Sequence, residues 1–354
     1  MRNLHAISAP KLMMRPLRYL PILILLGLAV HLLLPQLTEL RHSINVVEQM
    51  RLWAVGLAIL AQMLSYMGAG YLLHAASEVA GSRLTTRRGA FIIAGASAVG
   101  LVAAGMVGST AATFRWVRGS GVSREGSVLA SSLPSLFNNL LLAVTAIIGL
   151  LHLLIAHDLS TFQAIAFSLI LLILVLIIGT AAWGLSHRPW LAARMSRLSR
   201  RWAALRRKEY DPSGTQAELD RVFAIWYALK AGGWHGPLLG AAMTIGFDML
   251  TLYLIFVAAG HAVNPGVLLT GYGLPLLLGK VSFLPGGVGV VEGTMTALYD
   301  SLGVPDEVTV VVILAYRAIS FWLPLLLGFL LVPYLQHVTR SSQSLEEVEN
   351  VPTG

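Results

Sequence analysis

The residues best suited to chemistry in this chain lie in one apolar stretch near its C-terminal end. Lys280, Glu292 and Arg317 are ionisable, yet the segments around them are almost entirely apolar. Ionisable side chains within membrane-spanning segments are costly and usually mark functional sites. Arginine binds phosphate through a planar fork of N–H donors. We therefore expect Arg317 and Lys280 to bind a lipid phosphate, and Glu292 to bind a cationic head group or carry a proton.

Four further polar residues are candidates for the same site. Asp248 lies in the middle of another apolar run and could take the role of Glu292, and Tyr316 directly precedes Arg317. Asn138 and Asn139 are paired in a third apolar run, and we expect them to line the same cavity. A purely structural interpretation stays open, because the cations and carboxylates could neutralise one another and the asparagines could hydrogen-bond neighbouring helices.

Glycine and proline interrupt the C-terminal apolar stretch at Pro285, Gly286, Gly287 and Gly289. In a helix interior, glycine costs about 1 kcal/mol relative to alanine and proline about 3 kcal/mol, so the helix must break there. Non-helical backbone at membrane depth is tolerated only where it is buried in protein or lines a cavity. We therefore predict a re-entrant hairpin over residues 265–304, with these four residues as its hinge.

A second segment, 89–114, is rich in small residues and is predicted to form another re-entrant hairpin, with Gly105 and Gly108 at its hinge. If this segment crossed the membrane completely, the basic residues of 115–124 and 188–208 would lie outside. That placement contradicts the positive-inside rule. A hairpin that enters and returns keeps both basic segments in the cytoplasm.

The composition indicates an all-α polytopic membrane protein. The chain has 354 residues, of which 56% are hydrophobic and 12% charged, and its mean hydropathy is +0.73. A soluble domain would have about 25% charged residues. The net charge of +8 clusters beside apolar runs, which indicates membrane topology and not nucleic-acid binding. There is no cysteine, the histidines lack ligand spacing and no enzyme motif is recognisable, so we expect neither a metal nor a cofactor.

Six full spans and two hairpins account for the apolar segments. The predicted N-terminal membrane half is 1–186, followed by a basic linker at 187–233, a C-terminal membrane half at 234–335 and a disordered tail at 336–354. The linker has one apolar and one basic helical face, which is typical of a helix on a membrane surface, although a solvated basic loop stays an alternative. Six crossings place both termini in the cytoplasm. The predicted spans are 19–34, 52–76, 128–155, 162–185, 234–259 and 308–335.

The two halves share one order of elements, namely a span, a glycine-broken hairpin, a charged turn and a long span. A shift of 182 residues places Gly105 on Gly287 and Gly121 on Gly303. Because one extra span separates the copies, the predicted orientations are opposite. An inverted repeat of this kind is typical of secondary transporters, whose sites lie between the halves beside broken helices.

Residues 284–324 resemble the C-terminal signature of the lysylphosphatidylglycerol synthase transmembrane-region family, the flippase portion of multiple peptide resistance factors and their stand-alone relatives. The residues that carry the resemblance are Leu284-Pro-Gly-Gly-Val-Gly289 with Glu292, Leu302-Gly-Val-Pro305, Tyr316-Arg317 and Phe321-Trp-Leu-Pro324. The resemblance implies a prokaryotic plasma-membrane protein that moves a lipid between leaflets, with Glu292 and Arg317 at the family's charged positions. The soluble aminoacyl transferase domain of fused members is absent, so lipid synthesis is not expected.

We therefore expect a non-enzymatic lipid transporter, a flippase or scramblase. The alternatives are an accessory protein that presents a lipid to a separate glycosyl- or aminoacyl-transferase, and a membrane-embedded transferase with Asp248 or Glu292 as its base. The expected partners are membrane lipids with phosphate-bearing head groups. A separate transferase and a second copy of the chain stay open as partners.

Overall fold

The computed structural model describes the backbone of residues 44–79, 81–102, 105–156, 159–205, 212–282 and 284–349. Within these residues the regular elements are all helices, joined by turns and loops. In the described part of the chain, five helices are long and apolar enough to cross a membrane, namely Leu52–Val79, Gly126–Ile155, Thr161–Ser186, His235–Ala258 and Asp306–His337. The chain is therefore a multi-pass helical membrane protein. The span predicted at 19–34 lies outside the described residues.

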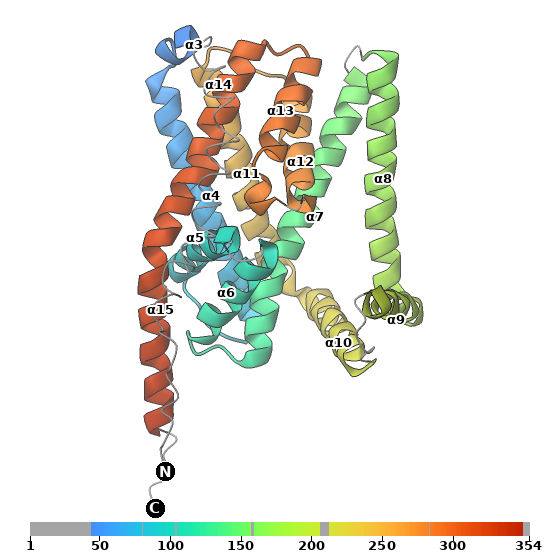
Figure 1. Cartoon of the computed structure of the whole chain (residues 1–354), viewed down its shortest axis with the longest axis vertical. Coiled ribbons are helices and arrows are strands. Elements are labelled where there is room, and N and C mark those ends of the chain that lie inside the picture. Colours follow the sequence, from blue (N-terminus) through green and yellow to red (C-terminus); the bar gives the residue numbers. More distant parts are fainter. Residues whose placement is uncertain are drawn as a thin grey trace, which may run out of the picture.

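The other five predicted spans are confirmed as long helices (Figure 1). They are α4 (Leu52–Val79), α7 (Arg124–Ala156), α8 (Thr161–Ser186), α11 (His235–Ala258) and the continuous run of α14 (Asp306–Arg317), η3 (Ala318–Trp322) and α15 (Leu323–Glu349). The π-helical turn η3 ends two residues before Pro324, and proline has no N–H to continue the α-helical ladder. In the structure α15 continues to Glu349, whereas the composition predicts a disordered tail from residue 336. Residues 336–349 contain neither glycine nor proline, so no helix breaker ends α15 there.

Each predicted hairpin is a pair of short helices joined at glycines. The first consists of α5 (Thr86–Val102) and α6 (Met106–Arg118), and the second of α12 (Pro265–Val281), the 3-10 turn η2 (Pro285–Gly287) and α13 (Val290–Ser301). In Figure 1 the first pair lies in the lower part of the bundle and the second in the upper part. The turns lie close together, because η2 packs against α5 and a Cβ at Gly286 would lie 3.6 Å from Leu101 Cδ1.

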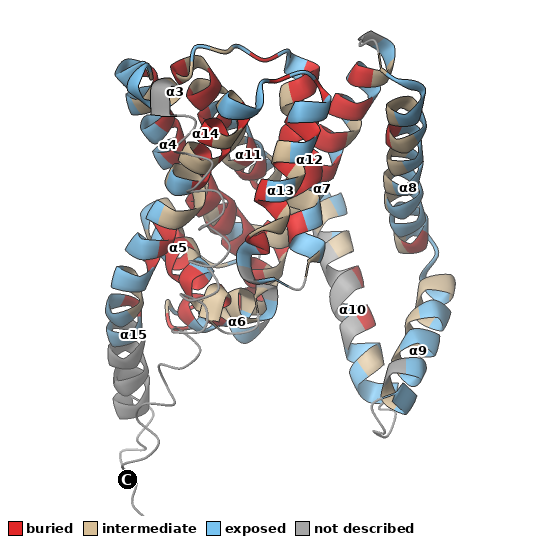
Figure 2. Ribbon diagram, turned by 45° about the horizontal axis from the view of Figure 1, so that its top comes forward, coloured by how far each residue is buried: buried red, intermediate tan, exposed pale blue. Residues whose placement is uncertain are grey.

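The most extensive helix contact is between α4 and α11, and glycine makes it close. A Cβ at Gly240 would lie 2.6 Å from Leu72 Cα, and a Cβ at Gly68 would lie 2.7 Å from the Thr244 backbone nitrogen. Ser65 adds a hydrogen bond from Oγ to the Thr244 carbonyl over 2.8 Å. Small residues that let backbones approach are the usual basis of helix association in membranes. Figure 2 shows buried residues gathered where α11 and α12 lie.

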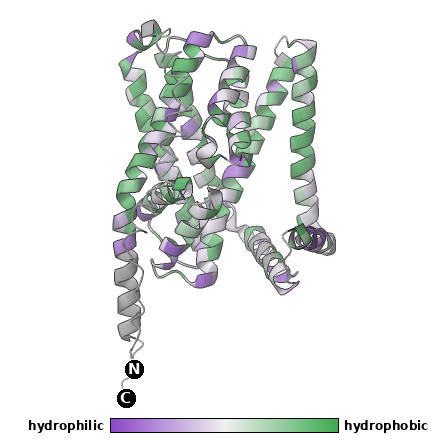
Figure 3. Ribbon diagram, in the orientation of Figure 1, coloured by the Kyte–Doolittle hydropathy of each residue, from purple (hydrophilic) through white to green (hydrophobic). Residues whose placement is uncertain are grey.

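The helix α8 stands beside α7 and is mostly exposed (Figure 2). Only 6% of the residues in its most apolar 18-residue segment are buried. Figure 3 shows that it is hydrophobic along nearly its whole length, which suits a helix surrounded by lipid. At its lower end the linker forms two helices, α9 (Arg188–Leu205) and α10 (Pro212–Ala228), joined by an exposed ion pair of Arg188 Nη2 with Asp220 Oδ1 at 2.6 Å. The chain then enters α11 through η1 (Leu229–Gly233), and a short helix, α3 (Ile44–Glu48), precedes α4.

Candidate functional site

A buried ion pair joins the second hairpin to the last membrane helix. Arg317, at the end of α14, donates from Nε to Glu292 Oε1 over 2.6 Å. Arg317 is 4% exposed and Glu292 is 2% exposed. Glu292 lies in the first turn of α13, and its Oε2 accepts a hydrogen bond from the Gly289 backbone N–H over 2.7 Å. The carboxylate therefore fixes both the guanidinium and the start of α13.

The same guanidinium contacts the hairpin turn and an aromatic ring. Arg317 Nη2 donates to the Gly286 carbonyl over 3.3 Å. The Arg317 Cζ atom also lies 4.1 Å from the centroid of the Phe321 ring, one helical turn further along, which is within the range of a cation–π interaction. Arg317 thus has three neighbours that stabilise its positive charge in the bundle interior.

Glycine is required at the hairpin turn by its backbone and by its surroundings. Gly286, Gly287 and Gly289 have φ values of 67°, 65° and 84°, a region that side chains with a Cβ disfavour. A Cβ at Gly287 would lie 2.8 Å from Gly279 Cα. The turn therefore positions the Gly286 carbonyl and the Gly289 N–H for the ion pair.

A second polar cluster surrounds Asp248 on α11. Tyr272 from α12 and Tyr316 from α14 each donate a hydroxyl hydrogen bond to Asp248 Oδ2 over 2.8 Å. Gln62 from α4 is a further hydrogen-bonding neighbour of this carboxylate and is 5% exposed. Because Tyr316 and Arg317 are consecutive, α14 holds one side chain in each cluster. Four helices thus converge on Asp248.

Lys280 forms its hydrogen bond with a residue outside the Arg317 ion pair. Its Nζ donates to Asn139 Oδ1 of α7 over 2.6 Å, so the lysine joins α12 to α7. The Oδ1 atom of the neighbouring Asn138 is buried and has no hydrogen-bond partner among the described residues. An acceptor left without a donor in this position is available to a ligand that carries one.

The predicted site residues are therefore brought together in three groups. Arg317 pairs with Glu292, Tyr316 binds Asp248, and Lys280 binds Asn139. The sequence left open which carboxylate would pair with Arg317, and the structure selects Glu292.

The hinge residues differ in their placement. Pro285, Gly286 and Gly287 form η2, and Gly289 directly precedes α13, as the sequence predicts. Gly105 directly precedes α6 with a φ of 59°, so it lies at the turn of the first hairpin. Gly108 lies inside α6 and does not have a positive φ, so its prediction as a hinge residue is wrong. The turn ends at Gly105 because that glycine supplies the left-handed backbone.

Three neighbours of the charged groups were not predicted from the sequence. Tyr272 lies between two glycines in an apolar arm, Gln62 is a lone amide in α4, and Phe321 lies four residues after Arg317. The spacing of Phe321 is a usable signal, because residues four apart face one another on a helix. The other two interactions depend on contacts between helices that are distant in sequence.

Parts of the chain resemble archaeal membrane proteins. It is 34% identical over 87 residues to a UPF0104 membrane protein of Methanothermobacter thermautotrophicus, a match that covers 25% of this chain and 26% of that protein. It is 36% identical over 87 residues to a UPF0104 membrane protein of Pyrococcus horikoshii, with the same coverage of 25% and 26%. The chain therefore spans about a quarter of the length of these relatives.

A wider match covers the helices that build both polar clusters. Residues 22–328 match the family described as the lysylphosphatidylglycerol synthase TM region. The matched region includes Asp248, the second hairpin and Arg317. Because the match extends over most of the chain, this protein belongs to the lysylphosphatidylglycerol synthase transmembrane-region family.

Proposed function

We propose that this protein transports a phosphate-bearing lipid between membrane leaflets as a flippase or scramblase. The observation that carries the proposal is the buried ion pair of Arg317 with Glu292, held at a glycine-broken hairpin inside a multi-pass helical bundle. Family membership supports a phospholipid as the transported molecule, because the family is named after a synthase of a phospholipid. We propose a prokaryotic plasma membrane as its location, with both termini in the cytoplasm.

The proposed architecture is an inverted repeat with two re-entrant hairpins. Reciprocal packing supports it, because α12 of the second hairpin packs against α7 while α5 of the first packs against α15. Both contacts are made at a glycine. A Cβ at Gly273 would lie 2.8 Å from the Ala146 nitrogen, and a Cβ at Gly328 would lie 2.3 Å from the Ala94 carbonyl oxygen. A shift of 182 residues places Ala146 on Gly328, so the two long helices use equivalent positions.

In the proposed mechanism the ion pair holds the second hairpin against α14, and a lipid phosphate breaks the pair by binding Arg317. Arg317 is 4% exposed, so a head group reaches it only when the second hairpin moves away from α14. A phosphate can replace the Glu292 carboxylate as the partner of the guanidinium, because both groups offer two oxygens that accept hydrogen bonds from the planar fork of arginine N–H donors. Displacement of the second hairpin would also disturb the Asp248 cluster, because Tyr272 on its helix α12 donates a hydrogen bond to Asp248 Oδ2. Glu292, once released, would bind a cationic head group or a proton.

The test is leaflet exchange by the purified full-length chain in liposomes that contain a fluorescently labelled phospholipid. We expect wild-type protein to expose inner-leaflet label to a membrane-impermeant quencher, and Arg317→Gln to reduce the exchange rate to that of empty liposomes. Breaking a buried pair costs about 3–5 kcal/mol of stability. The double variant Arg317→Gln/Glu292→Gln should therefore regain much of its thermal stability, because no charge is left buried alone, but it should not regain exchange.

The matched control is Arg188→Gln/Asp220→Asn, which removes an ion pair of the same 2.6 Å length at an exposed position outside the bundle. It should exchange lipid at the wild-type rate. Wild-type exchange by a folded Arg317→Gln variant would contradict the assigned role. Absence of exchange in wild-type liposomes would favour the accessory protein, and formation of a modified lipid would favour the embedded transferase.

A further inference from the structure

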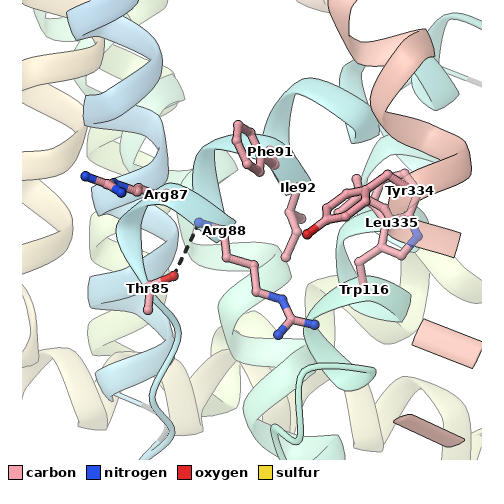
Figure 4. A pocket seen from close by; sticks show the side chains of 8 residues that line it. All are labelled: Thr85, Arg87, Arg88, Phe91, Ile92, Trp116, Tyr334 and Leu335. Atoms are coloured by element: carbon pink, nitrogen blue, oxygen red, sulfur yellow. Dashed lines mark hydrogen bonds between the residues drawn. The ribbon is translucent and has the colours of Figure 1, made fainter. Parts of the chain in front are cut away.

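A pocket of about 230 Å³ lies where the first hairpin meets the last helix, away from the polar clusters described above. It is bounded by the start of α5, by α6 and by α15 (Figure 4). This volume is below the roughly 300–1,000 Å³ of pockets that enclose whole drug-sized ligands. The pocket can therefore hold a small polar group while the remainder of a larger molecule stays outside.

The pocket contains one arginine directed toward its interior. Figure 4 shows the Arg88 side chain reaching toward the side on which Trp116 and Tyr334 lie, whereas Arg87 points away from them. Among the described residues neither guanidinium has an ion-pair partner, and no acidic side chain lines the pocket. Arg88 is therefore a cation without a compensating charge in the described part of the chain.

Part of the pocket lining is apolar and buried. Ile92 is fully buried, and Trp116 and Leu335 are 4% and 5% exposed. Gly95 makes this burial possible, because a Cβ there would lie 2.7 Å from Leu335 Cδ1. An anion that enters the pocket is thus held in surroundings of low polarity, where its attraction to Arg88 is stronger than in water.

The rim of the pocket is partly exposed and lies near one end of the last candidate membrane span. Phe91 is 45% exposed and Tyr334 is on the exposed side of α15, three residues before the candidate span ends at His337. Aromatic side chains with a polar tip are typical of this depth. Arginine also extends its charge from an apolar surface toward the head-group region.

We infer that this pocket binds the phosphate of an anionic phospholipid on the side of the membrane that carries the basic linker. Arg88 contacts the phosphate, Trp116 and Ile92 exclude water behind it, and the acyl chains lie against the exposed apolar surface of α5 and α15. The occupant is a membrane lipid and not a soluble anion, because the exposed apolar side chains of α5 and α15, such as Phe91 and Leu330, offer a surface that acyl chains would cover. This site differs from the Arg317 site in its helices and in its contacts.

The test is native mass spectrometry of the full-length protein in detergent with added phosphatidylglycerol or phosphatidylcholine. We expect retention of phosphatidylglycerol over phosphatidylcholine by the wild type. Arg88→Gln should weaken phosphatidylglycerol binding about tenfold, because a hydrogen-bonded charge contact is worth about that ratio or more. Arg88→Lys should lie between the two, since lysine keeps the charge but loses the donor fork.

The charge-matched control is Arg83→Gln, because Arg83 is exposed, precedes the same helix and does not line the pocket. Its lipid retention should equal that of the wild type. Equal weakening by Arg83→Gln and Arg88→Gln would overturn the assignment, as would full retention by a folded Arg88→Gln variant. Displacement of phosphatidylglycerol by inorganic phosphate at equal concentration would identify a soluble anion as the ligand and overturn the lipid assignment.

Discussion

At the scale of residues, the site depends on charges and hydroxyls that satisfy one another in the bundle interior. Arg317 has a carboxylate, a carbonyl and an aromatic ring as neighbours, and Asp248 accepts two tyrosine hydroxyls at one oxygen. A buried charge without such neighbours costs several kcal/mol, because water no longer stabilises it. The side chains that surround each charge are therefore as important to the site as the charges themselves.

Removal of either tyrosine hydroxyl at Asp248 should destabilise the protein by a similar amount. Tyr272→Phe and Tyr316→Phe each delete one 2.8 Å hydrogen bond to the same oxygen, and a hydrogen bond to a charged group contributes about 1.5–3 kcal/mol. Thermal unfolding of the two variants in detergent measures the effect. Tyr253→Phe, on the same helix as Asp248 and without a hydroxyl bond to it, should unfold as the wild type does. A large difference between the two variants would show that Asp248 is not shared equally.

At the scale of elements, the decisive feature is the glycine turn of the second hairpin. It directs a carbonyl and an N–H inward at the point where α14 presents Arg317. The first hairpin breaks at Gly105, and the turn η2 packs against its helix α5. A helix without such breaks would satisfy these backbone groups internally and leave none for the ion pair.

Alanine at Gly287 should be far more disruptive than alanine at Gly81. Both glycines have a positive φ, 65° and 71°, so both substitutions introduce comparable backbone strain. Only Gly287 also has a close neighbour, because its Cβ would lie 2.8 Å from Gly279 Cα, whereas nothing lies within 4 Å at Gly81. We expect Gly81→Ala to cost about 1–2 kcal/mol and Gly287→Ala to cost more and to abolish leaflet exchange. Equal thermal stability of the two variants would contradict the tight turn.

At the scale of the whole molecule, the two glycine-broken hairpins lie toward opposite ends of the bundle. The hairpins lie in the lower and upper parts of Figure 1, and each packs its first helix against the long helix of the other half. The apolar helix α8 stands outside this core and leads to the basic linker. A bundle with its polar groups between two opposed halves can expose them to either side by small relative movements.

The predicted sidedness can be measured directly, because the chain contains no cysteine. Single cysteines at exposed positions, Ser123→Cys after the first hairpin and Ala262→Cys before the second, should lie on opposite sides of the membrane. A membrane-impermeant thiol reagent applied to intact cells should label only the Ala262→Cys variant, and permeabilised cells should show labelling of both. Labelling of Ser123→Cys in intact cells would exclude the proposed inverted repeat.

The sequence by itself determined the helical membrane class, the positions of the helix breaks and the residue types that carry charge into the apolar interior. These features are local. They follow from the length of apolar runs, from the unfavourable helix propensity of glycine and proline, and from the free-energy cost of a charged side chain in the membrane. The sequence predicted Glu292, Asp248 and Arg317 as site residues without deciding how they pair.

Only the tertiary structure decided those pairings and added Tyr272, Gln62 and the pocket at Arg88. Helices such as α8 and α11 are apolar on nearly every side, so their sequences do not distinguish the face that meets lipid from the face that meets protein. The rotation of α11 against α4 is set by close contacts of glycines with the neighbouring backbone, such as that of Gly240 with Leu72. That rotation determines which polar side chains meet, because lipid and protein interior are equally favourable surroundings for an apolar face.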